Sequence, residues 1–226
     1  MKKLSIFKPT TIIKNFVGTV AVSSLLLASS AHAAESPREV KDWTFLVFLN
    51  GNNNLDSYGD DDINEMEQVG STDNVNVVVQ WASYARRDVQ RLYVQKDSQP
   101  GQVTSPVVQR MGAVDMGDVN SLVDFMKWAH ENYPARHYFV DVWNHGSGWH
   151  MNQSPFTKWS LRPTDISYDD TTGNSIKTEE LGQAMQAFAT VIGHKVDIYG
   201  SDACLMAMIE VAAEMKHAVS YSVGSE

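Results

Sequence analysis

This 226-residue chain contains one cysteine, Cys204, and seven histidines, so a Cys–His pairing is the first chemistry to consider. A thiolate is a strong nucleophile, and an imidazole can take up its proton and protonate a leaving amine. We select His145 because it follows a strand-like run, His137–Trp143, just as Cys204 follows Val196–Tyr199. If the two strands are parallel neighbours, both side chains emerge at the same carboxyl edge of a sheet, where open α/β sheets bind ligands. The pattern predicts a Cys–His dyad for acyl transfer.

The residues after Cys204 predict a helix that begins at the thiol. Leu205, Met208, Ile209 and Ala212 recur at helical spacing. Amide groups at a helix start favour a thiolate and can hold a developing oxyanion. Two other interpretations stay open from composition alone, an inert buried thiol and a bridge between chains.

Apolar patterning predicts alternating strands and helices, and therefore an α/β domain with a largely parallel sheet. The segment 146–174 shows no periodicity, and a loop of this length inside a compact domain is usually functional or flexible. A turn is expected at 50–54. Strands are expected at 43–49, 75–81, 90–95, 137–143 and 196–199, and in the last apolar run, 218–223. Helices are expected at 56–70, 118–132 and 178–192, and after Cys204.

Composition sets the class of protein. A hydrophobic content of 43% and a charged content of 20% are typical of a globular chain, and the length suits one domain. The net charge of −9 and the pI near 5.2 argue against nucleic-acid binding, which requires a basic face.

The first 33 residues have the features of a cleaved signal peptide. A basic start precedes the apolar run Val17–Ala28, and Ala31–Ala33 has the small-x-small cleavage pattern. A transmembrane anchor is the weaker alternative, since the apolar run is short, and we expect no stable membrane insertion. We therefore expect export to the periplasm or outside the cell, with residues 34–42 as a leader and 43–226 as the functional domain.

Metal binding is the main alternative chemistry, and the spacing does not favour it. His145 and His150 with Asp141 or Asp165 match no zinc motif that we can name. The run Asp60–Asp62 lacks the ligand spacing, glycine and terminal glutamate of an EF-hand, so we interpret it as a solvated helix start. No metal site is predicted.

Asp202, two residues before the thiol, has two interpretations. It is either a turn-forming aspartate that caps the next helix or a carboxylate placed to hold an Arg or Lys side chain of a substrate. The neighbouring residues do not decide between them.

Four motifs together resemble the clostripain family of cysteine peptidases, a branch of the caspase–gingipain–legumain clan. They are Phe-Leu-Asn-Gly-Asn-Asn-Asn-Leu-Asp (48–56), Trp-Asn-His-Gly-Ser-Gly-Trp (143–149), Ile-Ser-Tyr-Asp-Asp-Thr-Thr-Gly (166–173) and Asp-Ala-Cys-Leu-Met-Ala (202–207). The similarity runs from Trp43 to Glu226 in the same order. It implies a caspase-like three-layer α/β/α sandwich with a mostly parallel central sheet, and an endopeptidase that cuts protein or peptide substrates after Arg or Lys.

The resemblance also implies roles for single residues. Cys204 corresponds to the nucleophile and His145 to the general acid/base, with the backbone N–H groups of Gly146 and Cys204 as the oxyanion hole. Asp202 corresponds to the acid that binds the basic side chain. In this clan the imidazole and the thiol often lie apart in the free enzyme. The competing function is a non-catalytic caspase-like binding domain.

Family members are often zymogens that cut themselves between the histidine and the cysteine. Here Lys158 and Arg162 are the candidates, and Pro163 should hinder cleavage after Arg162, so Lys158–Trp159 is preferred. The chemistry needs no cofactor; the resemblance allows calcium, for which the sequence shows no site. Relatives extend past the residue that matches Glu226, so we expect the domain to be truncated at that end.

Overall fold

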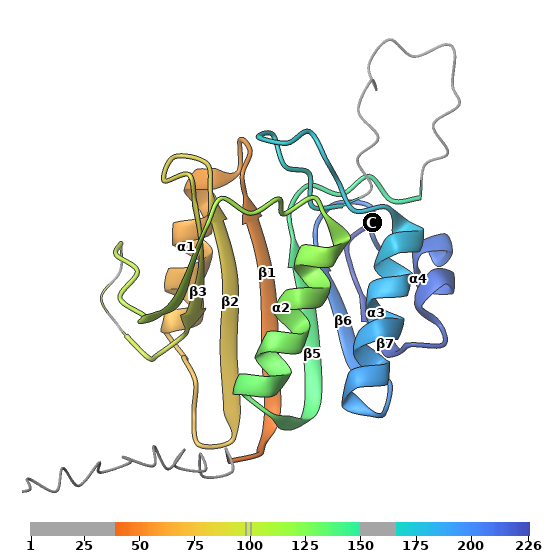
Figure 1. Ribbon diagram of the computed structural model, residues 1–226, viewed down its shortest axis with the longest axis horizontal. Helices are drawn as coiled ribbons and strands as arrows, with labels where there is room; N and C mark the ends of the chain where they lie inside the picture. The colour runs from red at the N-terminus through yellow and green to blue at the C-terminus, as the bar shows by residue number, and fades with distance from the viewer. Residues whose placement is uncertain (1–38, 98, 100, 150–165) are drawn as a thin grey trace, which may run out of the picture. The chain divides into compact units, whose positions relative to one another are not determined.

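The computed structural model describes residues 39–97, 99, 101–149 and 166–226, and a seven-stranded sheet forms its centre (Figure 1). The elements in chain order are β1 (Lys41–Gly51), α1 (Asp56–Glu67), β2 (Val75–Ser83), β3 (Asp88–Tyr93), β4 (Val107–Gly112), α2 (Val119–Asn132), β5 (Ala135–Trp143), α3 (Thr178–Ile192), β6 (Val196–Asp202), α4 (Ile209–Met215) and β7 (Val219–Val223).

The sheet is mostly parallel, with strand order β4-β3-β2-β1-β5-β6-β7. The pairs β1–β2, β1–β5, β5–β6 and β6–β7 are parallel, and only β2–β3 and β3–β4 are antiparallel. From β1 the chain builds one half of the sheet through β2 and the other half through β5. The gap between β1 and β5 is therefore the topological switch point, where sheets of this kind place ligands at the carboxyl edge.

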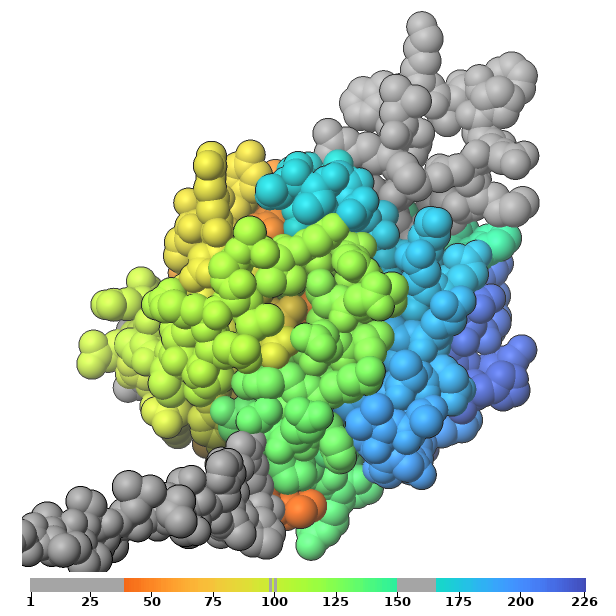
Figure 2. Space-filling model, in the orientation of Figure 1, coloured from red at the N-terminus to blue at the C-terminus, as the bar shows by residue number. Residues whose placement is uncertain are grey.

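Helices cover both faces of the sheet and complete three layers. The larger core lies between the sheet and α2, α3 and α4, and includes Phe48, Tyr138 and Phe188. The smaller core lies under α1 and includes Leu49, Ile63 and Trp143. Side chains of α2 and α3 cover the face that Figure 2 presents. The α/β/α architecture expected from the resemblance is confirmed.

Local signals set the helix ends. The Asp118 side chain accepts a hydrogen bond from the Asn120 amide at 2.9 Å and so caps α2. The Glu180 carboxylate accepts from the Lys177 amide at 3.0 Å at the start of α3. Gly193 ends α3 in the left-handed conformation, with φ of 80°.

The structure differs from the expected elements in two places. A strand not expected from the sequence, β4, forms the far edge of the sheet, and most of its residues are exposed. The helix expected after Cys204 begins only at Ile209. The signal-peptide and leader predictions fall largely on residues outside the described part of the chain. Within that part, no helix has the length and apolar character needed to cross a membrane.

Candidate active site

Two loops at the carboxyl edge of the sheet carry the predicted dyad. His145 follows β5 and Cys204 follows β6, and these strands pair in parallel. The last residues paired between them are Trp143 and Asp202. This last pair includes the first residue after β5, because the Asn144 amide donates to the Asp202 carbonyl at 3.2 Å. The two loops therefore lie side by side, and both His145 and Cys204 are exposed.

Gly146 lets the two loops touch. A Cβ atom there would lie 2.3 Å from the Cys204 carbonyl oxygen and 2.8 Å from Met206 Cγ. No side chain fits at such distances, so the position requires glycine. Gly146 and Cys204, whose amides the resemblance assigned to the oxyanion hole, are thus neighbours across the two loops.

Cys204 lies in a turn, and not at a helix start. α4 begins at Ile209, and the intervening turn contains Leu205 with φ of 62°, in the left-handed region. A residue in this conformation cannot propagate a right-handed helix, although the apolar spacing after Cys204 suggested one. The prediction that the amides of a helix start stabilise the Cys204 thiolate is wrong.

The imidazole of His145 is held by Asn54, a residue that the sequence analysis did not identify. His145 Nε2 lies 2.9 Å from Asn54 Oδ1. An amide oxygen only accepts, so Nε2 carries the proton and Nδ1 is bare in the neutral ring. No hydrogen bond joins the imidazole to the Cys204 thiol among the described residues. The dyad is therefore open. Asn54 holds the ring through Nε2, and Nδ1 is the nitrogen that is left to accept a proton.

Asn144 ties the His145 loop to its surroundings. Its Nδ2 donates to the Asn50 carbonyl at 2.7 Å, and its Oδ1 accepts from the Tyr168 amide at 2.9 Å. Asn50 in turn donates to Ser167 Oγ at 3.1 Å. Asn144 and Asn50 are both buried, so these bonds lie away from water and fix the loops firmly.

The turn after β1 is bound to the segment that precedes α3. Asn53 Nδ2 donates to the Tyr168 carbonyl at 2.9 Å, and Asn52 Nδ2 donates to Asp169 Oδ2 at 2.9 Å. The same Asp169 oxygen accepts from the Met116 amide at 3.1 Å, and the Asp169 residue is fully buried. The asparagine-rich stretch is thus a polar connector between three segments, in addition to the turn that the sequence predicted.

Three carboxylates gather on the α1 side of the strand ends. Asp202 is exposed at the end of β6, next to Asp141 of β5. Burial is the largest cause that raises the pKa of Asp141 to about 7, and the negative charge of Asp202 raises this pKa further. The Asp202 amide donates a hydrogen bond to the Asp141 carboxylate and partly offsets the rise. Burial also raises the pKa of Asp62, whose carboxylate accepts from the Trp143 indole. Asp62 therefore faces the sheet and is not the purely solvated residue that was expected. This group of carboxylates can hold a cationic side chain.

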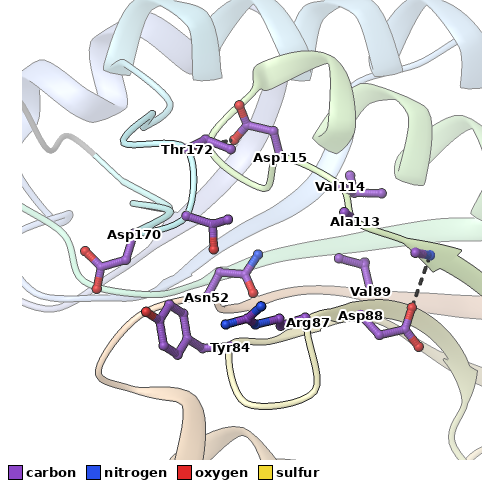
Figure 3. A pocket seen from close by; sticks show the side chains of 12 residues that line it. Asn52, Tyr84, Arg87, Asp88, Val89, Ala113, Val114, Asp115, Asp170 and Thr172 are labelled. Carbon is purple, nitrogen blue, oxygen red and sulfur yellow. Dashed lines mark hydrogen bonds between the residues drawn. The ribbon is translucent and has the colours of Figure 1, made fainter.

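A separate cavity of about 590 Å³ lies beside the turn after β1 (Figure 3). Neither His145 nor Cys204 lines it. Asn52, Tyr84 and Arg87 line one side of the cavity, and Asp115 and Thr172 lie across from them, joined by a hydrogen bond of 2.9 Å. Its mixed charges favour no single class of ligand.

Several sequence-predicted positions fall outside the described residues. They are the self-cleavage candidates Lys158 and Arg162 and the alternative metal ligands His150 and Asp165. In the described ranges, no three His, Cys, Asp or Glu side chains are grouped to hold a metal ion, and Asp60–Asp62 lie within α1.

The sequence of this chain matches a known protein family. The sequence profile of the clostripain family matches residues 47–226. A search of curated proteins found no match.

Solved structures with a similar fold include three secreted or zymogen proteases. A secreted C11 cysteine protease from Bacteroides thetaiotaomicron, in complex with an irreversible peptide inhibitor, is 26% identical with a TM-score of 0.61, over 80% of this chain and 48% of the other. An inactive zymogen C11 protease from Parabacteroides distasonis is 19% identical, with a TM-score of 0.62, over 82% and 49%. A further secreted C11 cysteine protease from B. thetaiotaomicron is 16% identical, with a TM-score of 0.63, over 82% and 52%. The present chain spans about half the length of these proteins.

Proposed function

The chain belongs to the clostripain family, and from this premise we propose that it is a cysteine endopeptidase that cuts protein or peptide substrates after Arg or Lys. The observation that carries the proposal is the contact between the two loops, in which Gly146 packs against the Cys204 carbonyl. His145 is the residue directly before Gly146. This geometry supplies a thiol, an imidazole and two backbone amides at one edge of the sheet.

The proposed reaction uses the thiol as the nucleophile. His145 Nδ1 takes the thiol proton, and the Cys204 sulfur attacks the scissile carbonyl carbon. The amides of Gly146 and Cys204 stabilise the oxyanion, the C–N bond breaks, and the imidazolium gives its proton to the leaving amine. Water, deprotonated by the same imidazole, then hydrolyses the thioester and restores the thiol.

Specificity for a basic side chain rests on the carboxylates of the strand ends. Asp202 is exposed beside Cys204, and the carboxyl groups of Asp141 and Asp62 lie on the same side of the sheet. A guanidinium or ammonium group at this position forms charge-assisted hydrogen bonds, whereas a neutral side chain does not. An acidic substrate side chain would be repelled.

We also propose that the protein is exported, to the periplasm or outside the cell, and made as a zymogen. One similar structure is described as a secreted protease and another as an inactive zymogen, and these descriptions concern those proteins. Self-cleavage between Lys158 and Trp159 would yield two fragments, because Pro163 disfavours the bond after Arg162. Two fragments in the wild type, with intact chains in Cys204→Ala and Lys158→Ala, would support this; equal fragmentation in all three would refute self-processing.

The direct test of the proposed function is covalent capture. The purified protein is incubated with an irreversible thiol-directed peptide inhibitor that carries Lys before its reactive group, and mass spectrometry measures the adduct. We expect one adduct at Cys204 in the wild type, and slower labelling in His145→Ala. Labelling at the rate of free cysteine in both proteins would contradict the proposal.

The second candidate is a non-catalytic binding domain of the same fold. In the described structure no hydrogen bond joins the Cys204 thiol to the His145 imidazole, and this open dyad is compatible with both functions. Alkylation by iodoacetamide at mildly acidic pH separates the two functions. Fast alkylation indicates a reactive thiolate and a peptidase, and alkylation at the rate of an ordinary thiol indicates a binding domain.

A further inference from the structure

The structure assigns Asn54 a function: we propose that it is the positioning residue of His145, and that His145 Nδ1 is therefore the nitrogen that exchanges protons with Cys204. The inference rests on the proposed peptidase function and adds to it a residue and a choice of ring nitrogen. It starts from one contact, His145 Nε2 to Asn54 Oδ1 at 2.9 Å.

This contact fixes both the tautomer and the orientation of the ring. The amide oxygen of Asn54 accepts, so the neutral imidazole keeps its proton on Nε2 and presents a lone pair on Nδ1. After proton uptake by Nδ1, the same oxygen still accepts from Nε2 and stabilises the imidazolium. A general base that depends on its second nitrogen for orientation works in this manner in hydrolytic triads.

The support of Asn54 is rigid although its side chain is exposed. The next amide along the chain, that of Leu55, donates to Asn53 Oδ1 at 2.8 Å. Asn53 itself is buried and donates to the Tyr168 carbonyl at 2.9 Å. The backbone that carries Asn54 is thus fixed by the hydrogen bonds of the buried Asn53 side chain, which is the arrangement that holds a functional side chain in one geometry.

The place of this contact in the fold has a functional meaning. Asn54 follows β1 and His145 follows β5, so the hydrogen bond crosses the topological switch point of the sheet (Figure 1). Asn144 binds the loop of His145 to the end of β1, just before the loop of Asn54, through the Asn50 carbonyl. Two separate bonds therefore set the distance between the loop of Asn54 and the loop of the base.

The test compares variants that keep or remove the acceptor. Asn54→Leu has a similar size and no acceptor, Asn54→Asp keeps an acceptor, and Asn74→Leu is the control. Asn74 is exposed in the turn before β2, at the amino edge of the sheet. With a lysyl fluorogenic peptide we expect kcat of Asn54→Leu to fall about 10- to 100-fold, as for a misplaced catalytic group, with KM within twofold. The kcat of Asn54→Asp, which keeps the acceptor, should recover most of the loss seen in Asn54→Leu, and Asn74→Leu should match wild type.

A spectroscopic readout makes the inference independent of turnover. Long-range ¹H–¹⁵N spectra of the neutral imidazole should show the proton of His145 on Nε2 in the wild type, and a mixture of the Nε2–H and Nδ1–H tautomers in Asn54→Leu. An unchanged tautomer in Asn54→Leu, or an unchanged kcat, overturns the assignment of Asn54 while the peptidase function stands. If Cys204→Ala and wild type are equally inactive, the peptidase function fails, and the tautomer measurement still decides whether Asn54 positions the ring.

Discussion

The main-chain amide of Asn144 donates to the main-chain carbonyl of Asp202 at 3.2 Å. This bond belongs to the last pair of the parallel ladder between β5 and β6, Trp143 and Asp202, and it includes the first residue after β5. It joins the residue before His145 to the residue two before Cys204. The proposed base and nucleophile are thus held together by backbone pairing, without a direct bond between their side chains.

Substitution of Gly146 tests this close packing. In Gly146→Ala the new methyl group would lie 2.3 Å from the Cys204 carbonyl oxygen, so the two loops must move apart. A displacement of about 1 Å costs about 100-fold in activity, and we expect kcat/KM to fall by at least this factor. Gly112→Ala is the control, because a Cβ atom at this position meets nothing within 4 Å. Gly112 has a φ of 68°, so the control also includes the backbone strain of an alanine in the left-handed region, without a steric clash. Equal activity of the two variants would contradict the packing argument.

Asn144 is predicted to stabilise the protein as well as the site. Asn144→Ala removes a buried donor to the Asn50 carbonyl and a buried acceptor for the Tyr168 amide. Each lost buried bond costs about 1–3 kcal/mol, so we expect a loss of about 3 kcal/mol and a Tm lower by about 6–12 °C. Thermal unfolding checks this, with Asn74→Ala as an exposed control. A Tm of Asn144→Ala equal to that of the control would contradict the prediction.

Asp141 should make the stability of the protein depend on pH. Burial and the charge of Asp202 raise its pKa from 3.8 in the reference state to about 7 in the fold. In this interval the folded protein keeps a proton that the unfolded chain has released, so the contribution of Asp141 to stability is present at low pH and is lost as pH rises toward 7. The contribution lost by pH 8 is of the order of 4 kcal/mol, as an upper limit.

The Asp141→Asn variant isolates this contribution. The difference in free energy of unfolding between Asp141→Asn and wild type should grow in favour of the variant as pH rises from about 4 to 8. Asp73→Asn serves as the control, because Asp73 is exposed in the turn before β2. Urea unfolding across this pH range measures the difference. A difference that does not change with pH would show that Asp141 is not perturbed.

Asp202 is predicted to set the preference for a basic side chain. Asp202→Asn removes the exposed charge beside Cys204 and keeps the size of the side chain. A charge-assisted hydrogen bond contributes about 1.5–3 kcal/mol, so kcat/KM for arginyl and lysyl peptides should fall about 10- to 100-fold. Peptides with Leu at the same position should be cut at an unchanged, low rate. A proportional loss for all peptides would assign Asp202 to structure instead of specificity.

Most of the fold was predictable because its signals are local. The continuous apolar run of β1 and the alternation of strands and helices indicate a parallel sheet covered on both faces. β4 was not predicted, since Val107–Gly112 is an edge strand with mostly exposed residues and two register irregularities, and it lacks the alternation that marks a half-buried strand. The helix after Cys204 was predicted too early because apolar spacing does not report the positive φ of Leu205.

The site was predictable only in part. Cys204 and His145 were found because each follows a recognisable strand, and parallel pairing brings strand ends together. Asn54 was missed because its bond to His145 joins residues 91 positions apart, and a run of asparagines signals only a turn. The raised pKa of Asp141 likewise depends on a neighbouring strand. Such contacts between distant segments have no signature in a single sequence.

The central claim, that Cys204 cuts bonds after basic residues, is tested most directly with fluorogenic peptides that carry Arg, Lys, Asp or Leu before the reporter. Wild type and Cys204→Ala are assayed side by side. The account predicts release after Arg and Lys by wild type only, with no release after Asp. Release that persists in Cys204→Ala, or wild-type cleavage that does not distinguish Arg and Lys from Asp, would contradict it.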